Sequence, residues 1–499
     1  MSGIKQLAGQ TMWYGVSSIA ARFLNYLLTP YITAKLLTNA FGEISTLYAA
    51  IPFLNVLFTY GLETAYFRFS KSPEDHERVY GTASLSLLTT TLLFTAALLL
   101  FRQPLAELLL FPRHPEYITF AALIIALDAA STLAFARLRY EGRPRMYALV
   151  RVLGILVNIG ATFFFLSYCP WIYKEDPYSW VHAFYRPGYE VGYLVLANLF
   201  QAGVTFLLLA KGVFAFQWRF DPKLWRELLA YAAPLILVGF AGMINETLDR
   251  LMLGWWSSEP TLEARKAEVG IYGACYKLSI LITLFIQAFR MGAEPFFFRQ
   301  AQGQDPTRTY ARVMKFFVIV ICVMFLVVAL YLDVWRYFIH ERYWAGLGVV
   351  PVLLLANMFL GIYYNLSIWY KLSNRTSAGA WITLIGAALT LGINYLFIPR
   401  FGYWACAWAT FCCYGSMMVV SYVWGQKAYP VPYPVKKILA YLFICVALYG
   451  IALAFQQLDL SRWINWGFSA LLLAAFGALL LKVERKEFAR LPVIGRYLG

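Results

Sequence analysis

The sequence predicts an all-α polytopic membrane protein of about 14 transmembrane helices: two six-helix lobes related by a parallel repeat, plus two C-terminal helices. Three observations predict this class: a composition of 61% hydrophobic and 14% charged residues, long uncharged runs, and an internal repeat. Soluble domains average about 25% charged residues. The net charge of +16 would suggest nucleic acid as a partner in a soluble protein. In a membrane protein, cytoplasmic loops carry an excess of Lys and Arg, and this excess can explain a positive net charge without a nucleic-acid partner.

The chain contains a series of apolar runs long enough to cross a membrane. A helix that crosses the roughly 30 Å hydrocarbon core needs about 20 apolar residues. Fourteen such runs lie at residues 11–34, 44–67, 80–101, 117–136, 147–168, 191–210, 228–252, 269–291, 313–332, 347–369, 378–398, 402–424, 438–455 and 463–481. Turn-forming residues such as Gly142-Arg-Pro144 separate them. No small-residue cleavage site follows the first run, so we expect no cleavable signal peptide.

Basic residues are divided unequally between the two sides of these spans. Loops on the side that includes both termini hold 25 of the 42 basic residues, and loops on the other side hold 11. Because cytoplasmic loops carry the excess of Lys and Arg, we expect both termini in the cytoplasm. The longest external segment, residues 169–190, is rich in aromatic residues. That pattern is typical of an interfacial belt, and it also suits a surface on which sugars stack.

The two halves of the chain repeat the same polar landmarks. A shift of 228 residues places Arg22 on Arg250 and Gly42 on Gly270, and a shift of 231 places Gly61–Arg68 on Gly292–Arg299. Each half has six spans, so both halves enter the membrane from the same side. We therefore predict an N-terminal lobe at 1–220, a C-terminal lobe at 221–430, and helices 13 and 14 with a basic tail at 431–499. Parallel repeats of this kind occur in transporters that bind substrate between the halves.

Four basic residues inside the spans are candidates for an anion-binding cavity. Arg22, Arg151, Arg250 and Lys277 lie within apolar runs, where a charge costs roughly 2.5–3.5 kcal/mol unless it meets a partner or water. Glu246 lies four residues before Arg250, so an internal ion pair is the simpler interpretation of that arginine. A cationic cavity is the functional one, since Arg and Lys both suit phosphate.

Other charged residues lie near the ends of the spans. Arg290 and Lys315 are expected to extend to the interface. The repeated motif contains the remaining set, which is Glu63, Arg68, Glu294 and Arg299. Under pseudo-symmetry Glu63 would meet Arg299 and Glu294 would meet Arg68, closing a cytoplasmic gate. Ordinary interfacial anchoring of these residues is the alternative.

The residues that enzymes and metal sites require are scarce. The seven Cys form no Cys-x-x-Cys pair, none of the four His lies in an apolar run, and no two Asp are two residues apart. We therefore expect no metal site, no cofactor and no enzymatic activity.

Several segments resemble bacterial polysaccharide flippases. The resemblance is carried by Asp249-Arg-Leu-Met-Leu-Gly254, Val269-Gly-Ile-Tyr-Gly-Ala-Cys-Tyr276, Glu294-Pro-Phe-Phe-Phe298 and the stretch from Tyr14 to Arg68. These flippases belong to the multidrug/oligosaccharidyl-lipid/polysaccharide (MOP) superfamily, which also includes multidrug exporters and lipid II flippases. The resemblance extends to about Gly425 and identifies the superfamily better than the sugar.

The resemblance implies a substrate and a location. The substrate would be an undecaprenyl-pyrophosphate-linked oligosaccharide, turned from the cytoplasmic to the outer leaflet of a bacterial inner membrane by alternating access. Glycosyltransferases or a polysaccharide polymerase would be partners, besides membrane lipids, and nucleic acid would not. Coupling to H+ or Na+ stays open, with Asp128, Glu246, Asp249 and Asn394 as candidate ligands. A lipid II-type flippase, a multidrug exporter of the same fold and a membrane glycosyltransferase or polymerase are the alternatives.

Overall fold

The computed structural model describes residues 19–488, apart from positions 21, 71, 217, 302–304, 374 and 459. Over these residues the chain is helical and contains no strand, which confirms the predicted all-α class. The helices are α2 Thr29–Lys35, α3 Thr38–Thr59, α4 Leu62–Phe69, α5 Pro73–Leu100, α6 Arg102–Leu108, α7 Glu116–Tyr140, α8 Pro144–Phe163, α9 Cys169–Glu175, α10 Glu190–Val213, α11 Pro222–Trp256, α12 Leu262–Gln300, α13 Pro306–Ala329, α14 Leu332–Trp335, α15 Val350–Leu366, α16 Ile368–Leu372, α17 Thr376–Phe401, α18 Tyr403–Ala428, α19 Val435–Gln456, α20 Arg462–Val483 and α21 Arg485–Phe488.

Within the described residues, 13 helical segments are long and apolar enough to cross a membrane. They coincide with the second to fourteenth predicted spans. The first predicted span, 11–34, is described from residue 19 onward, apart from position 21, and α2 is the helix with defined bounds in this part of it. Several segments are interrupted where the sequence suggested one helix: α3 ends at Thr59, and Gly61 adopts a positive φ of 74° before α4 begins.

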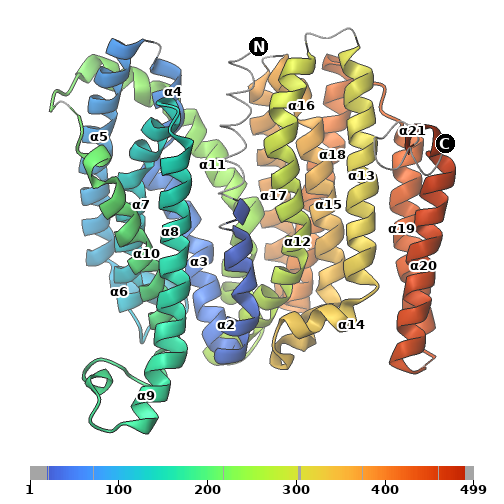
Figure 1. The fold of residues 1–499 in the computed structure, drawn as a ribbon, viewed down its shortest axis with the longest axis horizontal. Coiled ribbons are helices and arrows are strands. Elements are labelled where there is room, and N and C mark those ends of the chain that lie inside the picture. Colours follow the sequence, from blue (N-terminus) through green and yellow to red (C-terminus); the bar gives the residue numbers. More distant parts are fainter. Residues whose placement is uncertain are drawn as a thin grey trace.

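The helices form two bundles that stand side by side (Figure 1). One contains α3, α5, α7, α8 and α10, and the other contains α12, α13, α15, α17 and α18. Helix α11 lies between them, since it packs on α3, α4 and α5 and also on α12, α17 and α18. The predicted boundaries at residues 220 and 430 fall in the loops before α11 and α19.

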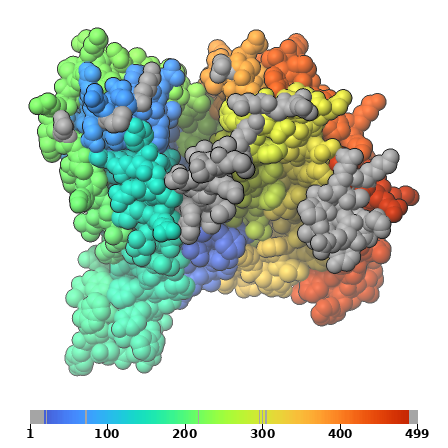
Figure 2. All heavy atoms as spheres, turned by 45° about the horizontal axis from the view of Figure 1, so that its top comes forward, coloured from blue at the N-terminus to red at the C-terminus, as the bar shows by residue number. Residues whose placement is uncertain are grey.

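The molecule has two distinct ends along the helix axes. At one end, which we call the basic end, α4, α7, α16, α18 and α20 finish and α5, α8, α11, α17 and α19 begin (Figure 1). The opposite end carries α6, α9 and α14. There the helical segment that continues α8 projects beyond the rest of the molecule, as Figures 1 and 2 both show.

The two bundles touch most closely where α3 crosses α12 near the opposite end. A side chain at Gly42 would overlap the carbonyl oxygen of Lys266, and one at Gly270 would overlap that of Thr38. Backbones approach this closely only where residues are small. Gly42 and Gly270 are equivalent positions of the sequence repeat, so the repeat places one landmark of each half against the other.

The appended helices α19 and α20 pack on α13. Glu484, directly after α20, is buried and accepts hydrogen bonds from Lys315 Nζ of α13 at 2.6 Å, Lys437 Nζ at 2.8 Å and the Tyr441 hydroxyl at 2.7 Å. The sequence predicted that Lys315 extends to the interface, and this is wrong. Lys315 is buried inside the protein because Glu484 of the C-terminal segment pairs with it there.

Candidate functional site

The charged residues of α11 gather around two tyrosines of α12. Asp249 is buried and accepts a hydrogen bond from the Tyr272 hydroxyl at 2.6 Å. The Arg250 guanidinium lies 3.8 Å from Asp249 and stacks over the Tyr276 ring at 4.2 Å. Arg250 also donates to Glu246, but to its backbone carbonyl at 3.3 Å. The ion pair suggested by the four-residue spacing is therefore not what holds this arginine.

Lys277 adds a second cation to this group. It lies beside Tyr276 on α12, close enough to Arg250 for the two positive charges to act on each other. Among the described residues, no carboxylate lies within ion-pair distance of Lys277, and none contacts it through a hydrogen bond. Arg250 has one carboxylate partner and Lys277 has no ion pair among the described residues. The two cations together therefore have N–H groups available to donate to an anionic ligand.

Arg22 reaches the same helix from the N-terminal half of the chain. Its guanidinium donates to the side-chain oxygen of Gln287 in α12. Gln287 follows Tyr276 by 11 residues, which is about three turns, so the two residues share one face of α12 roughly 16 Å apart. The structure thus brings Arg22, Arg250 and Lys277 to one helix, at two levels of it.

Arg151 does not belong to this group. It lies on α8 and stacks over the rings of Phe135 at 4.2 Å and Tyr147 at 5.6 Å. Asp128 of α7 interacts with Arg151 electrostatically. The structure places both residues within the N-terminal bundle, so a cation and an acid that the sequence assigned to different roles are neighbours.

Asn394 lies apart from the acids with which the sequence grouped it. It is completely buried in α17, and neither atom of its amide has a hydrogen-bond partner among the described residues. No hydrogen bond joins it to Asp249 there. Its buried amide remains a candidate ligand for a cation, but not as part of a single cluster with Asp128, Glu246 and Asp249.

The two repeated glutamates make equivalent ion pairs within their own bundles. Glu63 of α4 pairs with Arg139 of α7. Glu294 of α12 pairs with Lys371 of α16 at 2.6 Å and with Arg290 at 2.9 Å. Arg139 and Lys371 occupy equivalent positions when the sequence is shifted by 232 residues. In each half the repeated glutamate therefore pairs with a basic residue at the equivalent position.

The exchanged pairs predicted for a gate do not involve Arg68 in this conformation. Arg68 stacks over the ring of Tyr231 at 4.9 Å, and no ion pair joins it to Glu294. The side chain of Arg299 lies outside the described residues. Pairing of Glu63 with Arg299 stays a prediction for a conformation in which the basic ends of the bundles come together.

Charge reversal distinguishes the two arrangements of Glu63. We expect Glu63→Arg to lower transport several-fold, since a half-exposed ion pair contributes about 1 kcal/mol. Adding Arg139→Glu should restore transport if the pair within the bundle matters, as measured with the purified protein in proteoliposomes. Rescue by Arg299→Glu but not by Arg139→Glu would instead support the exchanged gate.

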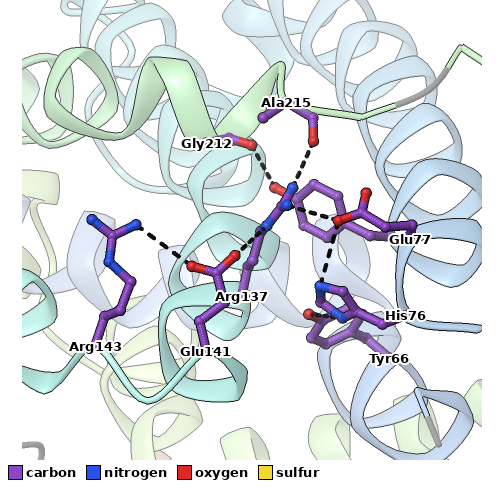
Figure 3. A network of polar contacts seen from close by, with 9 residues as sticks. Tyr66, His76, Glu77, Arg137, Glu141, Arg143, Gly212 and Ala215 are labelled. Carbon is purple, nitrogen blue, oxygen red and sulfur yellow. Dashed lines mark hydrogen bonds and ion pairs between the residues drawn. The ribbon is translucent and has the colours of Figure 1, made fainter. Parts of the chain in front are cut away.

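A polar network holds the basic end of the N-terminal bundle together (Figure 3). Arg137 of α7 donates to Glu77 at 2.8 Å, to Glu141 at 2.7 Å and to the Ala215 carbonyl at 2.6 Å. The Tyr66 hydroxyl of α4 and Nδ1 of His76 share a hydrogen bond of 2.9 Å. The network ties α4, α5, α7 and the end of α10 into one unit. Only its Arg137–Glu141 pair, four residues apart, could have been read from the sequence.

Contacts between the bundles concentrate at the opposite end. Lys266 of α12 is buried and donates to Glu43 of α3 at 2.9 Å. Nearby, the Arg342 guanidinium and the Tyr343 hydroxyl donate to the Leu36 carbonyl at 3.0 and 2.9 Å. Together with the α3–α12 crossing, these bonds close the opposite end. The sequence contained no signal for Glu43 and Lys266 as partners, because they come from helices 223 residues apart.

The basic end of the second bundle has a small surface pocket between α12, α15 and α16. Arg290, Glu294 and Lys371 are among its polar lining residues. Figure 1 shows this end at the top of the molecule, away from the closed α3–α12 crossing. The contacts that close the molecule therefore lie at the opposite end from this pocket.

Solved structures of transporters share this fold. A lipid II flippase MurJ in an inward closed conformation is 13% identical, with a TM-score of 0.67 over 94% of this chain and 99% of that one. An inward-facing multidrug resistance MATE family transporter of the MOP superfamily is 14% identical, with a TM-score of 0.59 over 86% and 95% of the two chains. An outward-facing one is 14% identical, with a TM-score of 0.55 over 88% and 96%. No curated protein matches the chain.

The chain therefore has the fold of these solved membrane transporters. Residues 7–301, more than half of the chain, match the family described as polysaccharide biosynthesis protein. The chain belongs to that family. The resemblance recognised in the sequence is therefore confirmed at the level of the family.

Proposed function

We propose that the protein flips an undecaprenyl-pyrophosphate-linked oligosaccharide across the inner membrane of a bacterium, for the synthesis of a surface polysaccharide. The observation that carries the proposal is the pair of cations Arg250 and Lys277, of which Lys277 has no carboxylate partner among the described residues. A pyrophosphate supplies the acceptor oxygens that these donors lack. A cationic drug would instead require an acidic site, which argues against the multidrug exporter.

The path of the pyrophosphate follows one face of α12. Arg290 and Lys371 lie at the basic end, Arg22 lies on Gln287 one turn deeper, and Arg250 lies about 16 Å beyond Gln287. The lipid tail stays in the bilayer while the charged group passes between the bundles. A lipid II-type substrate has the same pyrophosphate, so these residues do not separate the two glycolipids.

The direction follows from the loop charges and the membrane potential. Because basic loops are retained in the cytoplasm, the basic end would face inward, both termini would be cytoplasmic and the closed α3–α12 crossing would lie on the outer side. Moving an anion outward from a negative interior is favoured by roughly 2.3 kcal/mol per charge per 100 mV. A cation bound at Asp128, Glu246, Asp249 or Asn394 would add a chemical gradient of H+ or Na+ to this drive. Glycosyltransferases or a polymerase would supply and consume the glycolipid.

Removal of the paired cations tests the function. We expect Arg250→Gln and Lys277→Met each to lower flipping about tenfold to hundredfold, since a hydrogen bond to a charged group contributes about 1.5–3 kcal/mol. The assay uses proteoliposomes that contain the host's lipid-linked oligosaccharide, and it measures the fraction of glycan that membrane-impermeant periodate oxidises from outside.

The control is Arg308→Gln. Arg308 is 78% exposed and lies 3.4 Å from Asp305 at the start of α13, so its loss should leave flipping unchanged. Wild-type flipping in the Arg250→Gln, Lys277→Met double variant, with normal insertion, would contradict the proposal. Efflux of ethidium by the wild type would favour the drug exporter instead.

A further inference from the structure

The repeated glutamate of the second half has a cation beside it that the first half lacks. Glu294 pairs with Lys371 at 2.6 Å, as the repeat leads one to expect, and also with Arg290 at 2.9 Å. Arg290 lies two residues before the repeated glycine, where the first half has the uncharged Thr59. The pair between the glutamate and its equivalent basic residue is therefore common to both halves, and Arg290 is an addition of the second.

Asn365, in the last turn of α15, is another addition of the second half. It is 4% exposed and lines the small surface pocket between α12, α15 and α16. Its side-chain nitrogen has no hydrogen-bond partner among the described residues. The shift of 232 residues that matches Arg139 to Lys371 places Leu133 at this position of the first half, where it is buried in an apolar cluster. A buried amide without a partner destabilises the fold, so a ligand explains this asparagine better than packing does.

The pocket has an excess of positive charge and of hydrogen-bond donors. Its charged lining residues are Arg290, Lys371 and Glu294, which together carry one net positive charge. The Arg290 guanidinium stacks over the Tyr364 ring at 4.6 Å and donates to Glu294 through Nε. Among the described residues, neither terminal nitrogen of this guanidinium has a hydrogen-bond partner. These nitrogens and the Asn365 amide are donors of the kind that bind phosphate oxygens.

The pocket lies at the level where phosphate groups of lipids are found. Lys371 is one residue from the end of α16, and α17 begins after a short loop at Thr376. The ends of membrane-spanning segments coincide with the headgroup layer of the bilayer. A lipid of the adjacent leaflet therefore presents its phosphate at the depth of these donors.

We propose that Arg290, Lys371 and Asn365 form a binding site for a lipid phosphate, which the Glu294 carboxylate occupies in this conformation and the phosphate displaces. Carboxylate and phosphate use the same donors, so Glu294 is a competitor within the protein. A pyrophosphate carries more negative charge than one carboxylate or one phosphodiester, so it displaces Glu294 more readily than a phospholipid does. The inference rests on the proposed function, which brings a polyprenyl pyrophosphate to this side of the membrane.

The experiment measures binding of geranyl pyrophosphate to the full-length protein in detergent by isothermal titration calorimetry. The parent for all variants carries Arg250→Gln and Lys277→Met, so that the cations between α11 and α12 do not contribute. We expect Glu294→Gln to bind about fivefold more tightly than the parent, because the competing carboxylate is gone.

Asn365→Leu introduces the residue of the first half and should bind geranyl pyrophosphate about fivefold more weakly than the parent. Because the substitution removes an unpartnered buried amide, its thermal midpoint should be at least as high as that of the parent. Weaker binding by an equally stable protein distinguishes contact with a ligand from a structural role. Unchanged binding in Asn365→Leu would overturn the site.

The matched control is Glu63→Gln. It removes the same charge from the first half, where Thr59 and Leu133 replace the two added donors. Its affinity for geranyl pyrophosphate should equal that of the parent. An equal gain in Glu63→Gln and Glu294→Gln would overturn the inference, because the loss of one negative charge would then account for both.

A second probe identifies the source of the phosphate. Dihexanoyl phosphatidylglycerol, below its critical micelle concentration, should bind more weakly than geranyl pyrophosphate. Equal or tighter binding would overturn the assignment to a pyrophosphate and leave a site for phospholipid headgroups. The flippase proposal is tested separately, since it depends on Arg250 and Lys277, which the parent of these variants already lacks.

Discussion

Replacing Gly270 with leucine is expected to reduce transport more than 100-fold while leaving the protein folded and inserted. A side chain at this position would overlap the carbonyl oxygen of Thr38 and come within 2.9 Å of the Gly42 backbone nitrogen. Both neighbours are backbone, so they cannot rotate away. Overpacking of this kind costs about 1–3 kcal/mol or more. The strain acts only on the conformation in which α3 and α12 touch.

The effect is a shift between conformations rather than loss of the fold. A mutation shifts the equilibrium between two conformations only to the extent that it changes the free energy of one conformation more than that of the other. About 3 kcal/mol corresponds to a factor of roughly 150. The closed opposite end would become the minor state, and the pathway would no longer return to the basic side to bind a second substrate.

Cysteine accessibility measures this shift directly. Ala49 of α3 is 2% exposed, so Ala49→Cys should resist an impermeant maleimide added from outside when α3 and α12 are closed. The only exposed native cysteine among the described residues, Cys412, is first replaced by serine. In the Gly270→Leu background the reporter should become labelled. Protection equal to the wild type, together with normal transport, would contradict the role of the crossing.

Gly392→Leu is the matched control. Gly392 lies within the apolar helix α17, and a Cβ added there has no atom within 4 Å apart from its chain neighbours and the backbone of its own helix. It changes the same residue type to the same side chain without crowding a neighbour. Transport and labelling should therefore remain at the wild-type level.

The sequence predicted the class of fold because that class depends on composition and run length. Unpaired backbone groups are costly in hydrocarbon, so an apolar run that crosses a membrane has to form a helix or part of a closed barrel. Runs of about 20 apolar residues favour the helix. The repeat went further, since Gly42 and Gly270 could be matched without knowing that they touch. Glu63 and Glu294 likewise share a motif, and each pairs with a basic residue at the equivalent position.

The site was less predictable because depth in a span does not define the direction in which a side chain points. Arg22, Arg151 and Arg250 all lie inside spans, yet Arg151 stacks on aromatic rings of its own bundle, while the other two contact side chains of α12. Helix periodicity suggested Glu246 as the partner of Arg250. The tertiary contacts instead place Asp249 and Tyr276 around it, and Tyr276 comes from a different helix.

Neutralising Glu484 is expected to lower the free energy of unfolding by about 3–5 kcal/mol, because it leaves the buried Lys315 without its closest carboxylate. Glu484 is 2% exposed and bonds to Lys315, Lys437 and Tyr441. Glu484→Gln should therefore release α19 and α20 from α13 and lower the thermal midpoint in detergent. Limited proteolysis of the segment after Ala428 reports the release separately from global unfolding.

The matched control is Glu487→Gln. Glu487 lies one turn later, 3.6 Å from Lys315 and 3.4 Å from Arg312, and its side chain is 24% exposed. A partly exposed pair contributes up to about 1 kcal/mol, so this variant should shift the midpoint only slightly. Equal effects of the two substitutions would mean that Glu484 does not anchor the appended helices.

Acid should produce the same release in the wild type. Burial would raise the pKa of Glu484, but the hydrogen bonds from Lys315, Lys437 and Tyr441 outweigh it and lower the pKa to about 2. A carboxyl whose pKa falls on folding contributes stability above its unfolded pKa of about 4.3 and loses it as the pH falls towards the folded value. The shift corresponds to about 3 kcal/mol, in line with the expected effect of the substitution. Proteolysis after Ala428 should therefore increase between about pH 4 and pH 2 in the wild type and stay constant over that range in Glu484→Gln. A wild-type profile identical to that of the variant would show that protonation of Glu484 does not control the docking of α19 and α20.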